Sequence, residues 1–330
     1  MFRYLIRRLL AAAALIVVIS LITFFVFFAL PSNPALLACG KTCSPERLAQ
    51  IKQGLGLNQS ITTQYWEFFK GVFVGRNFSD ASIPLRCPAP CLGISFKTDT
   101  PVLSTLMNRF PADLSLALGS AVMFLTIGVG LGVLAAVKRG KLLDKLAVGG
   151  ALVGVSLQIY FMGLVLIWVF VDKWNLLPEP GYTPITQDPG AWFQGLLLPW
   201  ATLVILYLAL YTRLARSSML ETLSEDYIRT ARAKGLPQRT VILKHALRAA
   251  ITPIVTIFGM DLGSLIGGSA VITESVFGIN GIGKLAVDSV TDSDLPVIMG
   301  TSLFAATVII LFNVLVDLLY GVIDPRVRLA

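Results

Sequence analysis

Long runs of apolar residues alternate along this chain with shorter polar segments. Six of these runs are long enough to cross a hydrocarbon core of about 30 Å as helices. The predicted spans cover residues 9–30, 112–137, 146–171, 196–212, 251–277 and 298–323. The pattern therefore predicts an all-α membrane protein with six transmembrane helices.

The polar segments divide the chain into three parts. Residues 1–30 hold the first predicted span, and residues 31–111 form an extracytoplasmic insertion after it. Residues 112–330 hold the other five spans. This third part includes the basic segment 213–250, the longest polar interruption between the apolar runs, which we expect in the cytosol.

Composition and charge agree with a membrane protein. Hydrophobic residues make up 55% of the chain and charged residues 14%, whereas soluble domains contain about 25% charged residues. The net charge of +8 arises from Lys and Arg that gather in alternate gaps between the apolar runs. This positive-inside pattern predicts a multi-pass protein of the plasma or inner membrane with both termini in the cytoplasm. The charge is thus explained by orientation in lipid, and no nucleic acid is needed as a partner.

The first apolar run is interpreted as an uncleaved span. A secretory signal has an apolar core of only about 7–15 residues, and residues 9–30 exceed that length. Leu36-Leu-Ala-Cys39 is similar to a lipoprotein cleavage site, but it lies beyond the apolar run, behind Pro31 and Pro34.

The outer insertion contains all four cysteines, as Cys39-x3-Cys43 and Cys87-x3-Cys91. An extracytoplasmic location favours disulfides, and four cysteines allow three pairings, which the sequence leaves open. A four-thiolate zinc site is the alternative, although such sites usually belong to cytosolic modules.

The same insertion contains an amphipathic pattern. Tyr65, Phe68, Phe69 and Val72 recur at helical spacing. They predict a helix that lies against the outer membrane surface or against the bundle.

The basic cytosolic segment predicts two short helices joined by a tight turn. Gly235 suits the left-handed residue that ends a helix, and Pro237 suits the first turn of the next one. The second helix is predicted over residues 238–249. A solvated linker would carry a similar charge, but the Lys-Gly-Leu-Pro joint indicates an ordered element that contacts a partner protein.

This segment also carries a resemblance to a known family. Asp226–Gly235 (DYIRTARAKG), followed by His245–Pro253 (HALRAAITP), resembles the cytosolic "EAA" loop of ABC-importer permeases of the dipeptide/oligopeptide class. Only Ala231 and Gly235 match the general EAA pattern, and the rest follows the peptide-class version. The resemblance implies that the loop couples the chain to an ATPase subunit. The residues implied in this coupling are Tyr227, Arg229, Thr230, Ala231, Arg232, Ala233, Lys234 and Gly235.

The resemblance extends to residues 54–78, to Glu274–Gly283 and to Val316–Arg328. It implies a type I ABC-importer permease-like bundle that forms half of a translocation path for peptides. The implied partners are a second homologous permease subunit, two ABC ATPase subunits and an extracellular solute-binding protein. ATP and Mg²⁺ would be bound by the ATPases, and no cofactor is expected in this chain.

Enzyme motifs are weak in this sequence. Gly278–Lys284 fits the GxxxxGK pattern of a phosphate-binding loop, but Leu285 stands where a hydroxyl would hold Mg²⁺. The predicted topology also places this segment outside the cell, away from ATP. His245 is the single histidine, so neither a histidine metal cluster nor a conventional catalytic triad can form. We therefore expect a transport subunit that is not itself an enzyme.

The fifth predicted span contains three glycines on one helical face, Gly259, Gly263 and Gly267. Small residues at this spacing allow two helices to approach closely in lipid. We expect this face to pack against another helix.

Three acidic residues lie within predicted spans. Asp261 is near the middle of the fifth span, where it either lines the solute path or bonds a neighbouring helix. Glu274 is a second candidate for the path. Glu274 and Asp317 lie nearer the ends of their spans, and reaching water is the simpler explanation for both.

Three alternative functions remain open, and one of them is a membrane-embedded receptor or scaffold, which would have the same topology without solute flux. An ion-coupled secondary transporter would carry its own ion site, commonly with inverted repeats and broken helices, and neither feature is visible in the sequence. A permease of the same ABC type could also carry a different solute, such as a metal complex.

Overall fold

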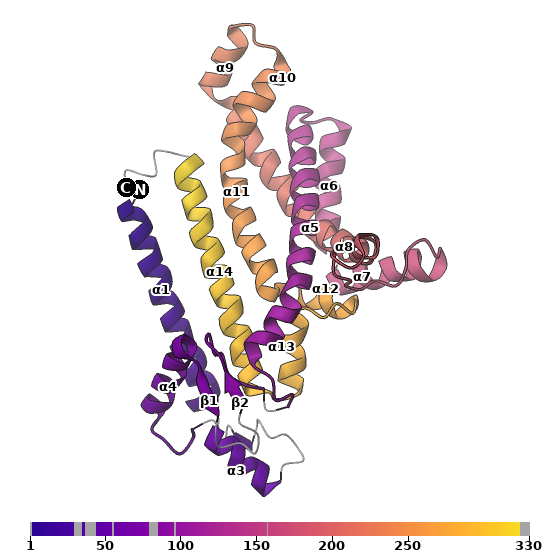
Figure 1. The fold of residues 1–330 in the computed structure, drawn as a ribbon. Coiled ribbons are helices and arrows are strands. Elements are labelled where there is room, and N and C mark those ends of the chain that lie inside the picture. Colours follow the sequence, from indigo (N-terminus) through magenta and orange to yellow (C-terminus); the bar gives the residue numbers. More distant parts are fainter. Residues whose placement is uncertain are drawn as a thin grey trace.

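The computed structural model describes residues 2–29, 35–36, 44–54, 56–78, 85–95, 97–156 and 158–323. Within these residues the protein is a bundle of long helices with a smaller layer of short helices and one β-hairpin at one end (Figure 1). Five helices are long and apolar enough to cross a membrane. The prediction of an all-α membrane protein is therefore confirmed, with a two-stranded hairpin added to it.

The elements in chain order, with π-helical turns written η, are α1 (Phe2–Phe24), η1 (Phe25–Ala29), α3 (Pro45–Gly54), α4 (Ile61–Val74), β1 (Arg76–Phe78), β2 (Leu85–Cys87), α5 (Val102–Val137), α6 (Leu142–Ser156), α7 (Ile159–Ile167), η2 (Trp168–Lys173), α8 (Pro189–Ser224), α9 (Asp226–Ala233), α10 (Gln238–Thr240), η3 (Val241–Ala246), α11 (Leu247–Ser264), η4 (Leu265–Ser269), α12 (Val271–Val276), α13 (Ile282–Thr291) and α14 (Leu295–Ile323).

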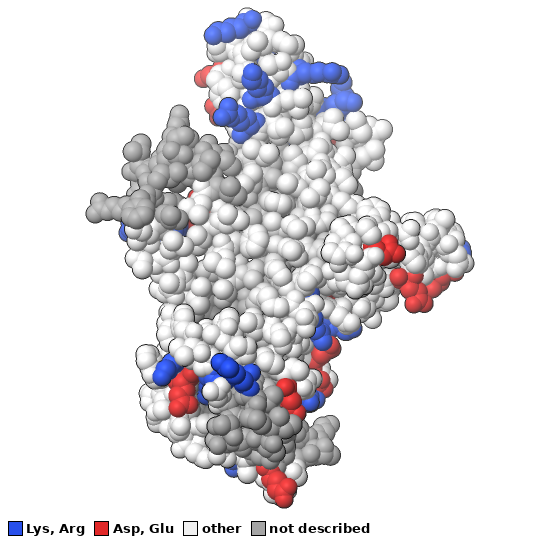
Figure 2. All heavy atoms as spheres, viewed as in Figure 1, with Lys and Arg blue, Asp and Glu red and all other residues white. Residues whose placement is uncertain are grey.

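Charged side chains gather towards the two ends of the bundle. On the face shown in Figure 2, Lys and Arg cluster over α9 and α10, acids and bases mix towards the opposite end, and a largely uncharged surface lies between. This distribution is what a hydrocarbon layer around the middle of the molecule requires.

Two of the helices extend beyond the predicted spans. Each of α5 and α8 contains 36 residues, which is about 54 Å of helix at 1.5 Å per residue. Both are therefore longer than the hydrocarbon core is thick, and α8 carries the fourth span directly into the cytosolic segment. The predicted third span, residues 146–171, corresponds to two shorter helices, α6 and α7, and neither is among the five long apolar helices.

The predicted fifth span, residues 251–277, is broken near its outer end. Its helix continues from Gln238 through residue 249 as far as a kink at Gly268, so the expected boundary at residue 249 is also wrong. The break occurs at Gly268, whose φ of +91° suits glycine alone among common residues. A side chain there would also lie 3.1 Å from the backbone nitrogen of Gly283. α12 therefore starts as a separate helix.

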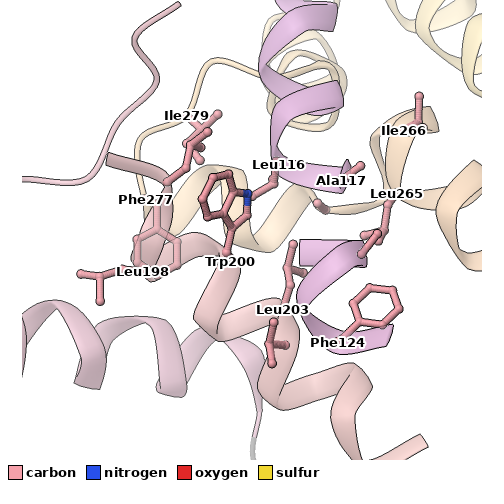
Figure 3. Packing of buried hydrophobic residues seen from close by; sticks show 14 of the residues in the cluster. Leu116, Ala117, Phe124, Leu198, Trp200, Leu203, Leu265, Ile266, Phe277 and Ile279 are labelled. Carbon is pink, nitrogen blue, oxygen red and sulfur yellow. The ribbon is translucent and has the colours of Figure 1, made fainter. Parts of the chain in front are cut away.

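The main core lies where α5, α8, η4 and the α12–α13 connection meet (Figure 3). Leu116, Phe124, Trp200, Phe277 and Ile279 are almost fully buried there. The indole nitrogen of Trp200 donates a 3.1 Å hydrogen bond to the carbonyl of Ser115. The α12–α13 connection is thus part of the bundle interior.

The glycine face of the fifth span lies against α14. A Cβ at Gly259 would come within 1.8 Å of Val316, and one at Gly263 within 2.6 Å of Phe312. At Gly267 the nearest atom is a backbone oxygen of α14, at 3.3 Å. The absence of side chains on this face lets α14, mainly through its side chains, pack directly against the backbone of the glycine-bearing helix.

The outer layer begins with α4, which packs through Phe68 against Phe24 of α1 and Met299 and Leu303 of α14. Tyr65 and Val72 also join this cluster. The predicted amphipathic helix is therefore present, and it packs against the bundle.

The β-hairpin that follows pairs Arg76 with Cys87. Cys87 forms a disulfide with Cys91. Cys39 and Cys43 lie outside the described residues, so their pairing stays a prediction.

A matched pair of glycines in α5 tests the close packing of α5 on α8. A Cβ at Gly132 would lie 2.7 Å from the Thr212 carbonyl oxygen and 3.0 Å from the Arg216 nitrogen, whereas nothing lies within 4 Å of one at Gly130. We expect Gly132→Val to lower the free energy of unfolding by about 1–3 kcal/mol, because backbone atoms cannot move aside. Gly130→Val should change it by about 0.5 kcal/mol or less. Thermal unfolding of the purified proteins in detergent measures both, and equal effects would contradict the packing.

Candidate functional site

The cytosolic element is built on a tight joint after α9. Gly235 has a φ of +76°, as predicted for the residue that ends this helix. Its N–H donates to the Arg232 carbonyl at 2.9 Å, and the Leu236 N–H donates to the Ala231 carbonyl at 3.4 Å. These two bonds satisfy the last carbonyls of α9 in a Schellman arrangement. Pro237 is the N-cap of α10, which starts at Gln238, the predicted start of the second helix.

α9 is held firmly between its two neighbours. Ile228 has no exposed surface, and Ala231 is buried beside it. They pack with Met219 of α8 and with Val241 and Ala246 of η3. α9 is therefore in direct contact with α8 and with the helix that continues into α11.

The outward side of this element is cationic and partly apolar. Tyr227 is 47% exposed, and Leu243 of the following helix is 60% exposed. Of the eight predicted coupling residues, Ala231 is buried, and the exposed ones are Tyr227, Arg229, Thr230, Arg232, Ala233, Lys234 and Gly235. Exposed apolar side chains among cations are suited to contact with a protein of opposite charge.

A second contact near the α9 element was not predicted from the sequence. Arg216 of α8 binds Asp144 at the start of α6 with two hydrogen bonds, Nε to Oδ1 at 2.5 Å and Nη2 to Oδ2 at 3.0 Å. The Gly140 N–H also donates to Oδ2, at 2.9 Å. The Arg216 hydrogen bond, and next that of Gly140, lower the pKa of Asp144 to about 2. The α5–α6 turn is thereby bound to α8 beside the α9 element. An acid inside a basic turn was the only signal of this contact in the sequence.

Asp261 of α11 forms a hydrogen bond with a residue of the neighbouring helix α8. The hydroxyl of Tyr211 on α8 donates to Oδ2 of Asp261 at 2.8 Å. Tyr211 is fully buried, whereas Asp261 keeps part of its surface exposed. The carboxylate thus has one hydrogen bond inside the bundle and remains partly accessible from outside this chain.

The other two acids were expected to reach water, and only Asp317 does so, with 29% of its side chain exposed. Glu274 has no exposed surface, so that expectation is wrong for Glu274, and in this conformation none of its side chain lines an open path. It lies opposite Asp113 of α5, which is 1% exposed. Asp317 binds Arg8 of α1 at 2.8 Å. The sequence analysis missed Asp113, although an acid at the start of the second apolar run was visible.

Comparison with known proteins identifies relatives along nearly the whole chain. Residues 1–117 match the N-terminal model of the binding-protein-dependent transport system membrane component. Residues 128–329 match the model of the binding-protein-dependent transport system inner membrane component. These matches confirm the resemblance inferred from the cytosolic segment.

Two relatives align with nearly the whole of this chain. The chain is 39% identical over 352 residues to the dipeptide transport system permease protein DppB of Escherichia coli, covering 99% of each protein. It is 36% identical over 325 residues to the probable peptide ABC transporter permease protein y4tP of Sinorhizobium fredii, covering 98% of this chain and 99% of the relative.

A solved structure shares the fold. A chain of the inward-facing MetNI methionine ABC transporter aligns with a TM-score of 0.51 at 15% identity, covering 67% of this chain and 97% of that chain. At this identity the match concerns the fold alone.

Trypsin cleavage tests the bond between Asp144 and Arg216. Because the pKa of Asp144 is lowered, the bond is complete above about pH 4 and is lost as the pH falls through about 2. At pH 8 the Asp144 carboxylate is charged, and Asp144→Asn removes that charge. We therefore expect this variant to weaken the bond with Arg216 and to speed trypsin cleavage in the basic turn at residues 138–141. Asp172→Asn, a change at an exposed acid elsewhere, is the control. Equal cleavage rates in the two variants would show that this bond does not hold the turn.

Proposed function

We propose that this chain forms half of the translocation path of an ATP-driven peptide importer. The chain belongs to the family of binding-protein-dependent transport system inner membrane components. The chain is a multi-pass inner-membrane component of such a system and not its catalytic subunit. Peptides are proposed as the solute because two relatives that cover nearly the whole chain are named as dipeptide and peptide permeases.

The proposed assembly contains further subunits. A second homologous permease completes the path, and two ABC ATPases bind ATP and Mg²⁺ beneath it. An extracellular solute-binding protein delivers the peptide, and lipid surrounds the bundle. This chain contributes no cofactor and binds no nucleic acid in this arrangement. Its surface cations, gathered over α9 and α10, are assigned to the ATPase contact (Figure 2).

The proposed topology has six crossings and both termini in the cytoplasm, as in a type I permease. Five crossings are the long apolar helices, and α6 with α7 forms the third crossing. The position of the cationic α9–α10 joint and the disulfide-bearing hairpin at opposite ends supports this orientation (Figure 1). Residues 1–30, 31–111 and 112–330 retain their proposed roles as first span, outer region and permease core.

The observation that carries the coupling proposal is the rigid mounting of α9. Its inner residues Ile228 and Ala231 pack against α8 and η3, and its outer residues face solvent. When the ATPases close, they push α9, and the two long helices attached to it move with it. The spans then rock between inward-open and outward-open states.

Asp261 is proposed to line the path. A carboxylate in the membrane is costly unless it faces water or a partner, and Asp261 remains partly exposed after its bond with Tyr211. Its place on α11, which continues from the ATPase-facing element, connects the proposed path to the coupling site.

Reconstituted transport tests the function. The complete complex, placed in liposomes with its binding protein, is expected to take up a labelled dipeptide when ATP is supplied. Uptake should persist after ionophores collapse all ion gradients, because the energy comes from ATP. If uptake stops when the ion gradients are collapsed, although ATP is still supplied, the protein is a secondary transporter. Competition by a metal complex but not by peptides would overturn the assignment of the solute.

Substitution of Gly235 tests the coupling element. Pro cannot adopt the φ of +76° and lacks the N–H that bonds Arg232, whereas Asn tolerates left-handed geometry. We expect Gly235→Pro to reduce co-purification of the ATPases by about tenfold, equivalent to about 1.4 kcal/mol, with expression intact. Gly235→Asn is the matched control and should retain binding. Equal recovery of the ATPases with both variants would contradict the coupling role.

A further inference from the structure

The α12–α13 connection turns into the interior of the bundle. α12 starts after the break at Gly268, and the chain then turns inward so that Phe277 and Ile279 join the main core (Figure 3). This connection lies in the half of the molecule that carries the outer layer, and α13 extends from it towards that layer (Figure 1). The contacts that hold this turn therefore also determine how α12 and α13 pack against the rest of the bundle.

Two acids from different helices hold this turn. Oδ2 of Asp113, on α5, accepts a 2.8 Å hydrogen bond from the N–H of Ile282. Oε2 of Glu274, on α12, accepts a 2.7 Å bond from the N–H of Lys284. Both donors belong to the first turn of α13, where free N–H groups and the helix dipole favour negative charge. The α13 N-terminus is thus held from two sides.

The two carboxyl groups are close to each other. A Cβ placed on Gly281 would lie 2.4 Å from Oε2 of Glu274 and 2.8 Å from Oδ1 of Asp113, so the two groups meet where residue 281 has no side chain. Glu274 is 0% exposed and Asp113 is 1% exposed. Two negative charges in such a place repel each other strongly, because little water screens them.

One oxygen of each acid also needs a partner. Oδ1 of Asp113 and Oε1 of Glu274 are buried and find no hydrogen-bond partner in the described part of the chain. A proton held between the two side chains removes one of the two charges and supplies a hydrogen bond between them. Aspartic-protease dyads illustrate the same arrangement of two carboxyls that share a proton.

The charged groups around the pair fit a single remaining negative charge. Arg109 of α5 donates to the Gly281 carbonyl at 3.4 Å and supplies a nearby positive charge. The Lys284 ammonium bonds Asn280 at 3.4 Å and is exposed. One partly buried cation beside two buried acids compensates for a single negative charge, so the charge balance favours a proton shared between the acids.

We propose that Asp113 and Glu274 share one proton and act as a clasp that positions the α12–α13 turn in the interior of the bundle. Loss of the shared proton adds a second buried negative charge and weakens the hold on the turn. Both acids are positioning residues, because they act through the turn and not on the solute. The clasp itself follows from the contacts of this chain, and only its role in closing a transport path rests on the proposed function.

Thermal unfolding of the purified complex, followed from pH 6 to pH 10, tests the clasp. In the unmodified protein we expect the midpoint to fall as the pH rises, by on the order of 3 °C. Asp113→Asn and Glu274→Gln should have nearly unchanged midpoints at pH 7 and should lose this alkaline fall. Their amides supply the hydrogen bond and cannot ionise. Asp113→Ala should be destabilised at every pH.

Two results would overturn the shared proton. One is an alkaline fall of the same size in the unmodified protein and in both amide variants. The second result is an unfolding midpoint at pH 7 that is as low in an amide variant as in Asp113→Ala. That result would mean that both acids must be ionised to hold the turn. Other groups that titrate at high pH are common to all the proteins and cancel in the comparison.

Dipeptide uptake by the same complexes measures the consequence for transport. At alkaline pH the amide variants should retain about threefold more of their pH 7 uptake than the unmodified complex does. Identical pH profiles for uptake would contradict a role of the clasp in transport. No ATP-driven uptake by the unmodified complex at any pH would contradict the proposed function, and the unfolding profiles would still decide whether the proton is shared.

Discussion

The exclusion of unpaired charge from hydrocarbon organises this permease. On the face shown in Figure 2, cations are concentrated towards the ends of the bundle. Three acids within the predicted spans each have a partner on another helix. Asp317 binds Arg8, Asp261 binds Tyr211, and Glu274 lies against Asp113. Because each pairing joins two different helices, the constraint on charge also decides which helices are held together.

The same helices connect the two ends of the molecule. α8 and the helix that begins at Gln238 both run from the α9–α10 element into the bundle, and Ile228 of α9 packs against both. The second of these helices ends at Gly268, where the α12–α13 turn begins. A push on α9 therefore has a continuous mechanical route to the α12–α13 turn.

Features that depend on local sequence could be predicted, and those that depend on distant contacts could not. The apolar runs indicated the long helices, and Gly235 next to a lysine indicated the helix end. The break at Gly268 was missed because its neighbour Gly267 belongs to a regular glycine face, and its conformation is imposed by the approach of α13. The pairing of Asp113 with Glu274 was missed for a related reason. It requires the inward turn at Gly281, which no periodicity indicates.

The central claim is that α9 moves with its own long helices as one body. The most direct measurement is the distance between spin labels at the exposed positions Thr230, on α9, and Ser217, on α8, in the complete importer with and without ATP. The structure predicts that this distance stays the same, while the distance from Thr230 to a label on the second permease subunit changes. A change between Thr230 and Ser217, with no change between the two subunits, would show that α9 swings independently and would contradict the lever.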